Sequence, residues 1–152
     1  MTQFVDADHA GDQMNRRSHT GILIYICRAP IIWYSKKQNT VESSTFGSEI
    51  VAMRIGLEKT KGLRYKLRMM GVPIDGPTSV FCDNMSVVTS TSVPTSTLSK
   101  KHLGICYHAV REAVAAGVHR IAHIAGARNL ADVLTKLLTA AVKKPLIGQI
   151  LY

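Results

Sequence analysis

The chain has 152 residues, of which 46% are hydrophobic, and its 19 lysines and arginines outnumber 10 acidic residues, for a formal net charge of +9. This length and apolar content predict one compact domain, and no apolar run approaches the roughly 20 residues that span a bilayer. Three scattered cysteines without a CxxC pair argue against a disulfide framework and favour reduced thiols in a cytosolic setting. The excess positive charge modestly favours a polyanionic partner such as nucleic acid.

Three short apolar, β-branched segments open the chain and predict strands. They span Thr2–Ala7, Gly21–Cys27 and Ile31–Ser35. The short connections between them indicate an antiparallel meander. Because the first strand begins almost at residue 1, with no basic-then-apolar signal segment before it, we expect a piece cut from a longer polypeptide.

After the third strand, the apolar residues recur at helical spacing, beginning with Ile50, Met53 and Leu57. Gly71 and Pro73 end this helix. The remaining predicted elements are a strand at Thr78–Cys82, a helix at Met85–Thr91, a helix at Lys101–Ala116, a strand at Val118–Ile124 and a last helix with the apolar face Leu130, Leu134, Leu137 and Leu138. Strand–helix–strand units favour parallel pairing and right-handed crossovers. We therefore predict an α/β fold with a mixed sheet and flanking helices over residues 1–142, and a C-terminal tail at 143–152.

The first strand carries two carboxylates on one face, because Asp6 and Asp8 are two residues apart. At roughly 5 Å and an effective dielectric of about 20, their repulsion costs on the order of 3 kcal/mol, so the pair predicts a cation nearby. Asp83 directly follows the fourth strand. If the first and fourth strands are parallel neighbours, Asp83 approaches Asp6.

Two further carboxylates fall where this fold can bring them to the same place. Glu49 lies at the start of the long helix, and Asp132 lies in the first turn of the last helix, three residues after the capping Asn129. Each acidic residue alone has a structural explanation as a turn, a helix-dipole partner or a cap. Together they predict a site for Mg²⁺ or Mn²⁺, in which two ions about 4 Å apart would act on a phosphodiester.

A series of short motifs runs in order along nearly the whole chain and is more specific than any one of them. The motifs are Val5 to Asp12, Arg16-Arg17-Ser18, Thr20-Gly21, Ile32 to Gln38, Ser43-Ser44-Thr45, Ser48-Glu49, Cys82-Asp83-Asn84, Lys101-His102-Leu103, Tyr107-His108 and Leu130 to Lys136. The series resembles the ribonuclease H domain of copia-type LTR retrotransposon Pol polyproteins.

This resemblance implies a five-stranded mixed sheet, three strands antiparallel and two parallel, and Mg²⁺-dependent cleavage of the RNA strand of RNA–DNA hybrids. It places the family's four carboxylates, which hold two Mg²⁺ or Mn²⁺ ions, on Asp6, Glu49, Asp83 and Asp132. We expect Asp6 to bridge the ions and Asp8 to be an outer-shell group. The resemblance also implies a reverse transcriptase domain in the parent polyprotein and a cytoplasmic, virus-like-particle location, with no membrane partner.

Recognition of RNA requires contact with its 2′-hydroxyl groups. Ser44 and Thr45 precede Glu49, and Asn84 follows Asp83, so these side chains can contact the backbone near the cut, although helix capping and turn formation explain them equally well. Phosphate contacts, which position a duplex without reading its bases, are expected from Arg16, Arg17, Lys36, Lys37, Lys100, Lys101 and, more weakly, Arg128. His123 lies in a predicted strand, where a structural role is the better explanation.

Several positions depart from the family pattern without removing a predicted metal ligand. His9 stands where the family usually has Trp, Phe46 where it has Glu, and Leu137 where it has Pro. These replacements, with Gly104 in place of an Asp, motivate the alternative of a hybrid-binding module that keeps the fold and has lost turnover. An integrase-like strand transferase is a weaker alternative, because in those enzymes the catalytic Glu follows the second Asp.

Overall fold

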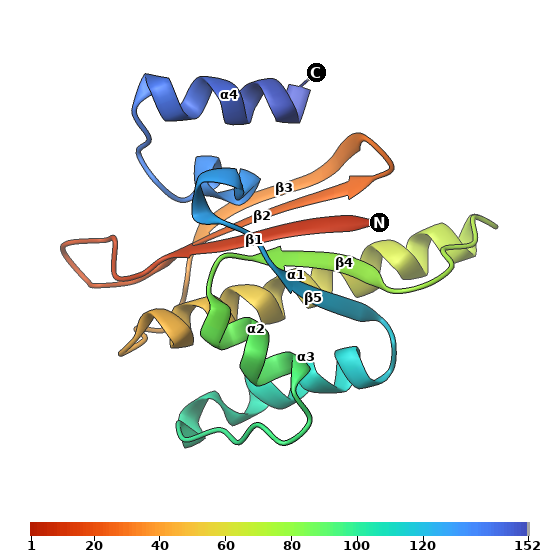
Figure 1. The fold of residues 1–152 in the computed structure, drawn as a ribbon, viewed down its shortest axis with the longest axis horizontal. Coiled ribbons are helices and arrows are strands. Elements are labelled where there is room, and N and C mark those ends of the chain that lie inside the picture. Colours follow the sequence, from red (N-terminus) through yellow and green to blue (C-terminus); the bar gives the residue numbers. More distant parts are fainter. Residues whose placement is uncertain (152) are drawn as a thin grey trace.

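A computed structural model, which describes residues 1–151, has a five-stranded mixed sheet at its centre (Figure 1). The strands are β1 (Thr2–Asp8), β2 (His19–Ile26), β3 (Ala29–Lys37), β4 (Thr78–Cys82) and β5 (His119–His123), in the order β3-β2-β1-β4-β5. The pairs β1–β2 and β2–β3 are antiparallel, whereas β1–β4 and β4–β5 are parallel. The predicted fold class is therefore confirmed.

Helices cover both faces of the sheet. On one face lie α1 (Thr45–Met69), α2 (Met85–Ser92) and α3 (Gly104–Ala115), and on the other lie the short 3₁₀ helix η3 (Leu130–Leu134) and α4 (Ala140–Leu151) (Figure 1). Val5, Ile50 and Val80 belong to the core on the α1 face, whereas Leu23 and Leu146 belong to a smaller core under η3 and α4. Within residues 1–151, no helix combines the length and apolarity needed to cross a membrane.

The parallel ladder between β1 and β4 is short, and its end positions the site. Paired residues run only from Thr2 opposite Ser79 to Phe4 opposite Phe81. Beyond this point the ladder stops, although β1 continues to Asp8. Ligand sites of open α/β sheets lie outside the carboxyl ends of parallel strands, and Asp6 and Asp83 both lie at this end.

Helix α1 packs very closely on β1, which fixes the direction in which its first turns point. A Cβ atom added at Gly56 would lie 2.1 Å from Gln3 Nε2, so only glycine fits this crossing without displacing a side chain. Thr60 Oγ1 donates a hydrogen bond to Gln3 Oε1 one turn further on. At the other end of the helix, Ser44 caps α1 by accepting from Gly47 N at 3.2 Å.

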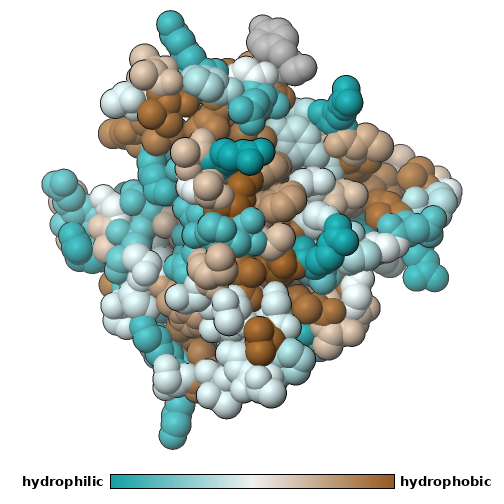
Figure 2. Space-filling view, viewed as in Figure 1, coloured by the Kyte–Doolittle hydropathy of each residue, from teal (hydrophilic) through white to brown (hydrophobic). Residues whose placement is uncertain are grey.

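The end of the chain differs from the prediction of one continuous last helix. The 3₁₀ helix η3 ends at Leu134, α4 begins only at Ala140, and Leu137, expected on a buried face, is fully exposed. The chain leaves the helical path because the side chains of Thr135 and Lys136 turn toward Asp6. Helix α4 then packs Leu146 into the smaller core on this face of the sheet. Hydrophobic residues remain on the surface near α4 (Figure 2). The domain boundary between residues 142 and 143 stays a prediction.

Two other segments differ in detail from the sequence-based expectations. The predicted helix at Lys101–Ala116 begins as a separate 3₁₀ turn, η1 (Lys101–Leu103), before α3 starts at Gly104. The segment Gly126–Arg128, which follows the predicted strand Val118–Ile124 and lies in no predicted element, forms a further 3₁₀ turn, η2. Neither difference changes the topology.

Candidate metal centre

Four carboxylates from four separate elements converge where β1 and β4 part. Asp6 comes from β1, Glu49 from the second turn of α1, Asp83 from the residue after β4, and Asp132 from η3. One oxygen from each of Asp6, Asp83 and Asp132 lies within 4.8 Å of the others, and Glu49, Cys82 and Asp83 form a second group by the same measure. Because Asp83 belongs to both groups, the structure brings all four predicted carboxylates into one cluster.

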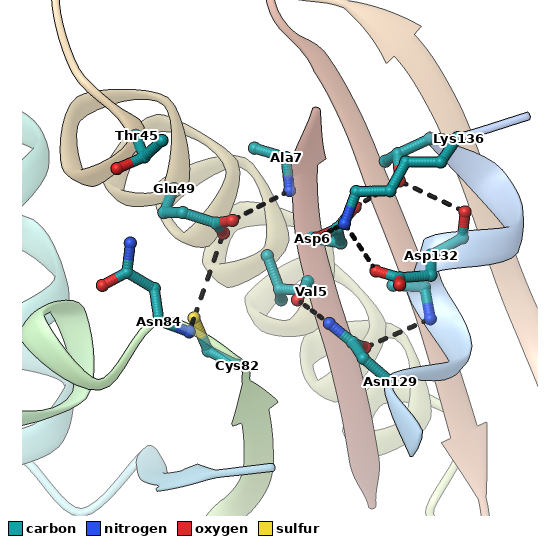
Figure 3. Close-up of polar contacts among 12 residues, drawn as sticks. Val5, Asp6, Ala7, Thr45, Glu49, Cys82, Asn84, Asn129, Asp132 and Lys136 are labelled. Carbon is teal, nitrogen blue, oxygen red and sulfur yellow. Dashed lines mark hydrogen bonds and ion pairs between the residues drawn. The ribbon is translucent and has the colours of Figure 1, made fainter. Parts of the chain in front are cut away.

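Glu49 reaches across from α1 to the edge of β1 (Figure 3). Its side chain is buried, with the residue only 5% exposed, and its Oε1 accepts a hydrogen bond from Ala7 N at 3.3 Å. Its Oε2 lies 3.9 Å from Cys82 Sγ, which donates to it. Glu49 and its neighbour Ile50 lie on the buried side of α1, as the helical spacing predicted.

Asp132 is positioned by its neighbour Asn129, which is fully buried. Asn129 Oδ1 accepts from Ala131 N at 3.2 Å and so caps η3, as the sequence predicted. Its Nδ2 donates to Val5 O at 2.9 Å, a contact between residues 124 positions apart that no local pattern predicts (Figure 3). This amide therefore ties η3 to β1 beside Asp6.

Lys136 and Thr135 complete the site and were not among the predicted site residues. Lys136 Nζ lies 3.1 Å from Asp6 Oδ1 and 2.9 Å from Asp132 Oδ1 (Figure 3). Thr135 Oγ1 donates to Asp6 Oδ2, so both oxygens of this buried carboxylate have donors. Two signals were available: Lys136 follows Asp132 by four residues, the spacing of a helical ion pair, and both Thr135 and Lys136 lie in the motif Leu130 to Lys136.

The carboxylates raise one another's pKa. For Glu49, burial and then the charges of Asp6 and Asp83 raise the pKa well above its usual value. Burial and the charge of Asp6 also raise the pKa of Asp83, and they raise that of Asp132 to about 6 despite the opposing effect of Lys136. Burial disfavours the charged form of Lys136, but Asp6 and Asp132 outweigh this effect and raise its pKa. One ammonium thus faces four carboxylates, which leaves negative charge that a cation would neutralise.

The donor set fits a hard divalent cation. Its oxygens are carboxylate oxygens, the ligands that Mg²⁺ and Mn²⁺ prefer. The sulfur of Cys82 is a poor candidate ligand, because burial and the charge of Glu49 raise the pKa of its thiol. The residues present therefore fit Mg²⁺ or Mn²⁺ and do not resemble a zinc site.

A shallow cleft is lined by three of the four carboxylates, and some predicted substrate contacts line it as well. Its lining includes Asp8, Thr45 and Asn84 together with Asp6, Glu49 and Asp83. Asn84 also caps α2 by accepting from Val87 N. Ser44 lies outside this lining, where it caps α1 and accepts from Lys100 Nζ. Asp8 belongs to neither three-ligand group, and its outer-shell role stays a prediction.

The predicted phosphate contacts lie outside the cleft lining. Arg16 and Arg17 are exposed in the β1–β2 loop, and Lys36 and Lys37 are exposed at the end of β3, none of them in the cleft lining. Lys37 is paired with Asp12 at 2.5 Å.

Two basic residues, Arg128 and His123, belong to segments that lie beside Asp83. Arg128 is exposed on η2. Gly126 of the same turn lies next to Asp83, because a Cβ atom added at Gly126 would lie 3.3 Å from Asp83 Oδ2. His123 Nε2 lies 3.1 Å from the backbone oxygen of Asp83, a contact that fits the structural role expected for this histidine.

Sequence comparison finds relatives among transposon polyproteins. The chain is 32% identical over 136 residues, 90% of its length, to the retrovirus-related Pol polyprotein from transposon RE1 of Arabidopsis thaliana. It is 32% identical over 134 residues, 88% of its length, to the Pol polyprotein from transposon TNT 1-94 of Nicotiana tabacum. The chain spans only 9% and 10% of these two polyproteins. No protein-family model matches it.

Structural comparison finds ribonuclease H domains. The N-terminal RNase H domain of Rv2228c from Mycobacterium tuberculosis, fused to maltose-binding protein, matches with a TM-score of 0.66 at 16% identity, over 97% of this chain and 95% of that one. LC11-RNase H1 in complex with an RNA/DNA hybrid matches with a TM-score of 0.67 at 16% identity, over 88% of this chain and 92% of that one. These likenesses show the fold.

Proposed function

Because this chain belongs to the ribonuclease H-like domains of copia-type retrotransposon Pol polyproteins, we propose that it is an endoribonuclease that cleaves the RNA strand of RNA–DNA hybrids. The observation that carries the proposal is the convergence of Asp6, Glu49, Asp83 and Asp132 from four elements. Such a cluster is expensive to assemble without a cation, since burial and mutual repulsion disfavour its charged form.

In this proposal the four carboxylates hold two divalent ions, Mg²⁺ or Mn²⁺. When bound, such ions activate a water for attack on phosphorus and stabilise the leaving oxygen. The chain itself supplies the preorganised ligands. The bonds from Ala7 N to Glu49 and from Thr135 to Asp6 fix these carboxylates before substrate binds, and Asn129 fixes η3 beside them.

The cleft lining supports a role for Thr45 and Asn84 in contacting the RNA backbone. Both lie beside Glu49 and Asp83, where a hydroxyl and an amide can bond to a ribose 2′-hydroxyl. The hydroxyl of Ser44 is already engaged by Gly47 and Lys100, so we assign it to positioning the start of α1.

We assign the basic surface to the phosphates of the hybrid. Arg16, Arg17, Lys36 and Lys37 would hold phosphates away from the cut, and Arg128 phosphates beside Asp83. These contacts are sequence-independent, and binding weakens with salt. The reverse transcriptase domain in the parent polyprotein and the cytoplasmic virus-like particle remain parts of the same proposal, because the chain covers a tenth or less of its relatives.

The test is cleavage of an end-labelled RNA–DNA hybrid by the purified domain in Mg²⁺. Asp83→Asn removes one charged ligand at nearly constant size and should reduce cleavage to background. Asp75→Asn, in an exposed loop outside the site, is the matched control and should cleave like the wild type. Duplex DNA should remain intact. Equal cleavage by wild type and Asp83→Asn would refute the proposal.

The same preparations separate the enzyme from the alternative of a hybrid-binding module, which the replacements at His9 and Phe46 motivate. Tight hybrid binding without cleavage, even in Mn²⁺, would favour the binding module. Turnover in Mg²⁺ that is lost in Asp83→Asn would exclude it.

A further inference from the structure

Lys136 places a positive charge among the carboxylates of the candidate metal centre. Its Nζ bridges Asp6 on β1 and Asp132 on η3, at 3.1 Å and 2.9 Å. We propose that Lys136 is an internal counterion that occupies a cation position of this centre and has to withdraw before that position accepts a divalent ion. The inference rests on the proposed function, because it assigns a role within the same site.

The contacts of Lys136 are those of a cation, because both are with carboxylate oxygens. The same two residues, with Asp83, form the three-oxygen group that fits a divalent ion. A divalent ion binds such oxygens at about 2.0–2.6 Å, closer than an ammonium does. An ion held there would face the ammonium at short range, so the two positive charges exclude each other.

The structure does not need Lys136 to hold η3 in place. Asn129 already joins η3 to Val5 of β1 through a buried hydrogen bond, and Thr135 donates to the second oxygen of Asp6. The side chain of Lys136 is also 35% exposed, whereas that of Asp6 is 1% exposed. The lysine therefore has a path to solvent that the carboxylate lacks, and it can move while its partners stay.

This position makes Lys136 a positioning residue with two opposite effects. Without metal, it neutralises part of the charge of Asp6 and Asp132 and stabilises the fold. With metal, it competes for the same oxygens and weakens divalent binding. A purely structural lysine would stabilise the fold under both conditions and would leave metal affinity unchanged or strengthen it.

The experiment measures Mn²⁺ and Mg²⁺ binding to the nucleic-acid-free domain by isothermal titration calorimetry, so that it does not depend on nuclease activity. Lys136→Met keeps the aliphatic length and removes the charge, and we expect it to bind Mn²⁺ at least roughly threefold more tightly than the wild type. Lys143→Met removes an exposed lysine at the start of α4 and is the matched control for net charge. It should bind like the wild type, and Lys136→Arg should retain weak binding.

Thermal unfolding supplies a second readout. In EDTA, Lys136→Met should unfold at a lower temperature than the wild type, and saturating Mn²⁺ should raise its unfolding temperature by more than it raises that of the wild type. Equal or weaker Mn²⁺ binding by Lys136→Met, with normal folding, would overturn the counterion role alone. Absence of saturable divalent binding in the wild type and all variants would overturn the metal centre, and the counterion role with it.

Discussion

Acidification should destabilise this domain through His119, a residue outside the candidate metal centre. His119 begins β5 and is only 2% exposed, and both of its ring nitrogens lack a hydrogen-bond partner among the described residues. Burial, and then the positive charges of Arg64 and Lys61, lower its pKa from 6.5 to about 4. The folded state therefore holds a neutral imidazole, whereas the unfolded chain takes up a proton below about pH 6.5.

The sign and the size of the effect follow from this difference. Because the pKa of His119 is lower in the folded state, its contribution is fully present above pH 6.5 and is lost as pH falls toward 4. Linkage over these two pKa values gives a loss of about 2 kcal/mol in unfolding free energy between about pH 7.5 and about pH 5. The carboxylates with raised pKa act in the opposite direction, so the wild-type curve alone does not isolate the histidine.

Urea unfolding of matched variants isolates the contribution of His119 to the pH dependence of stability. His119→Leu removes the titrating group at similar volume. As pH falls from about 7.5 to about 5, the unfolding free energy of the wild type should decrease by about 2 kcal/mol relative to that of the variant. His108→Leu removes an exposed histidine and should retain the wild-type difference between the two pH values. Parallel pH curves for wild type and His119→Leu would refute the reasoning.

Three further predictions concern Asn129, two glycines of α1 and the β1–β2 loop. Asn129→Ala removes the donor to Val5 O and the cap of η3, and should lower the free energy of unfolding in urea by about 1–3 kcal/mol. An unchanged urea midpoint would contradict the bridging role of Asn129. Gly56→Ala forces a Cβ against Gln3 and should cost about 1–3 kcal/mol, whereas Gly62→Ala, with nothing within 4 Å, should stabilise α1 by up to about 1 kcal/mol. Arg16→Ala should weaken hybrid binding and lower its logarithmic salt slope by about 1, and an unchanged slope would remove this residue from the interface.

The order of elements along the chain was sufficient to predict a mixed sheet with flanking helices, and the family resemblance supplied the five-stranded pattern and supported the set of four carboxylates. The structure meets the condition under which Asp83 approaches Asp6, because β4 is the parallel neighbour of β1. Glu49 was placed by helical spacing next to buried Ile50. Local pattern and tertiary structure agree at these positions.

Other features depend on contacts between distant residues, which periodicity does not report. Leu130, Leu134 and Leu137 have the spacing of an amphipathic helix, but the bonds of Thr135 and Lys136 to Asp6 end the helix early. The spacing of Lys136 and Asp132 indicates a helical ion pair, whereas the second partner of Lys136, Asp6, is 130 residues away and no local pattern predicts it. The sequence located the basic residues of the β1–β2 loop but did not predict where their side chains point, because the direction of an exposed side chain depends little on local sequence.

The contacts of Asp6 also constrain the order of events during synthesis. Its partners Thr135 and Lys136 follow it by 129 and 130 residues. During most of translation, the nascent chain therefore contains Asp6 without either partner. A chain that terminates before residue 135 never acquires them. Synthesis must therefore reach Lys136 before Asp6 has both of its donors, and a chain that ends before residue 135 leaves this buried carboxylate with neither.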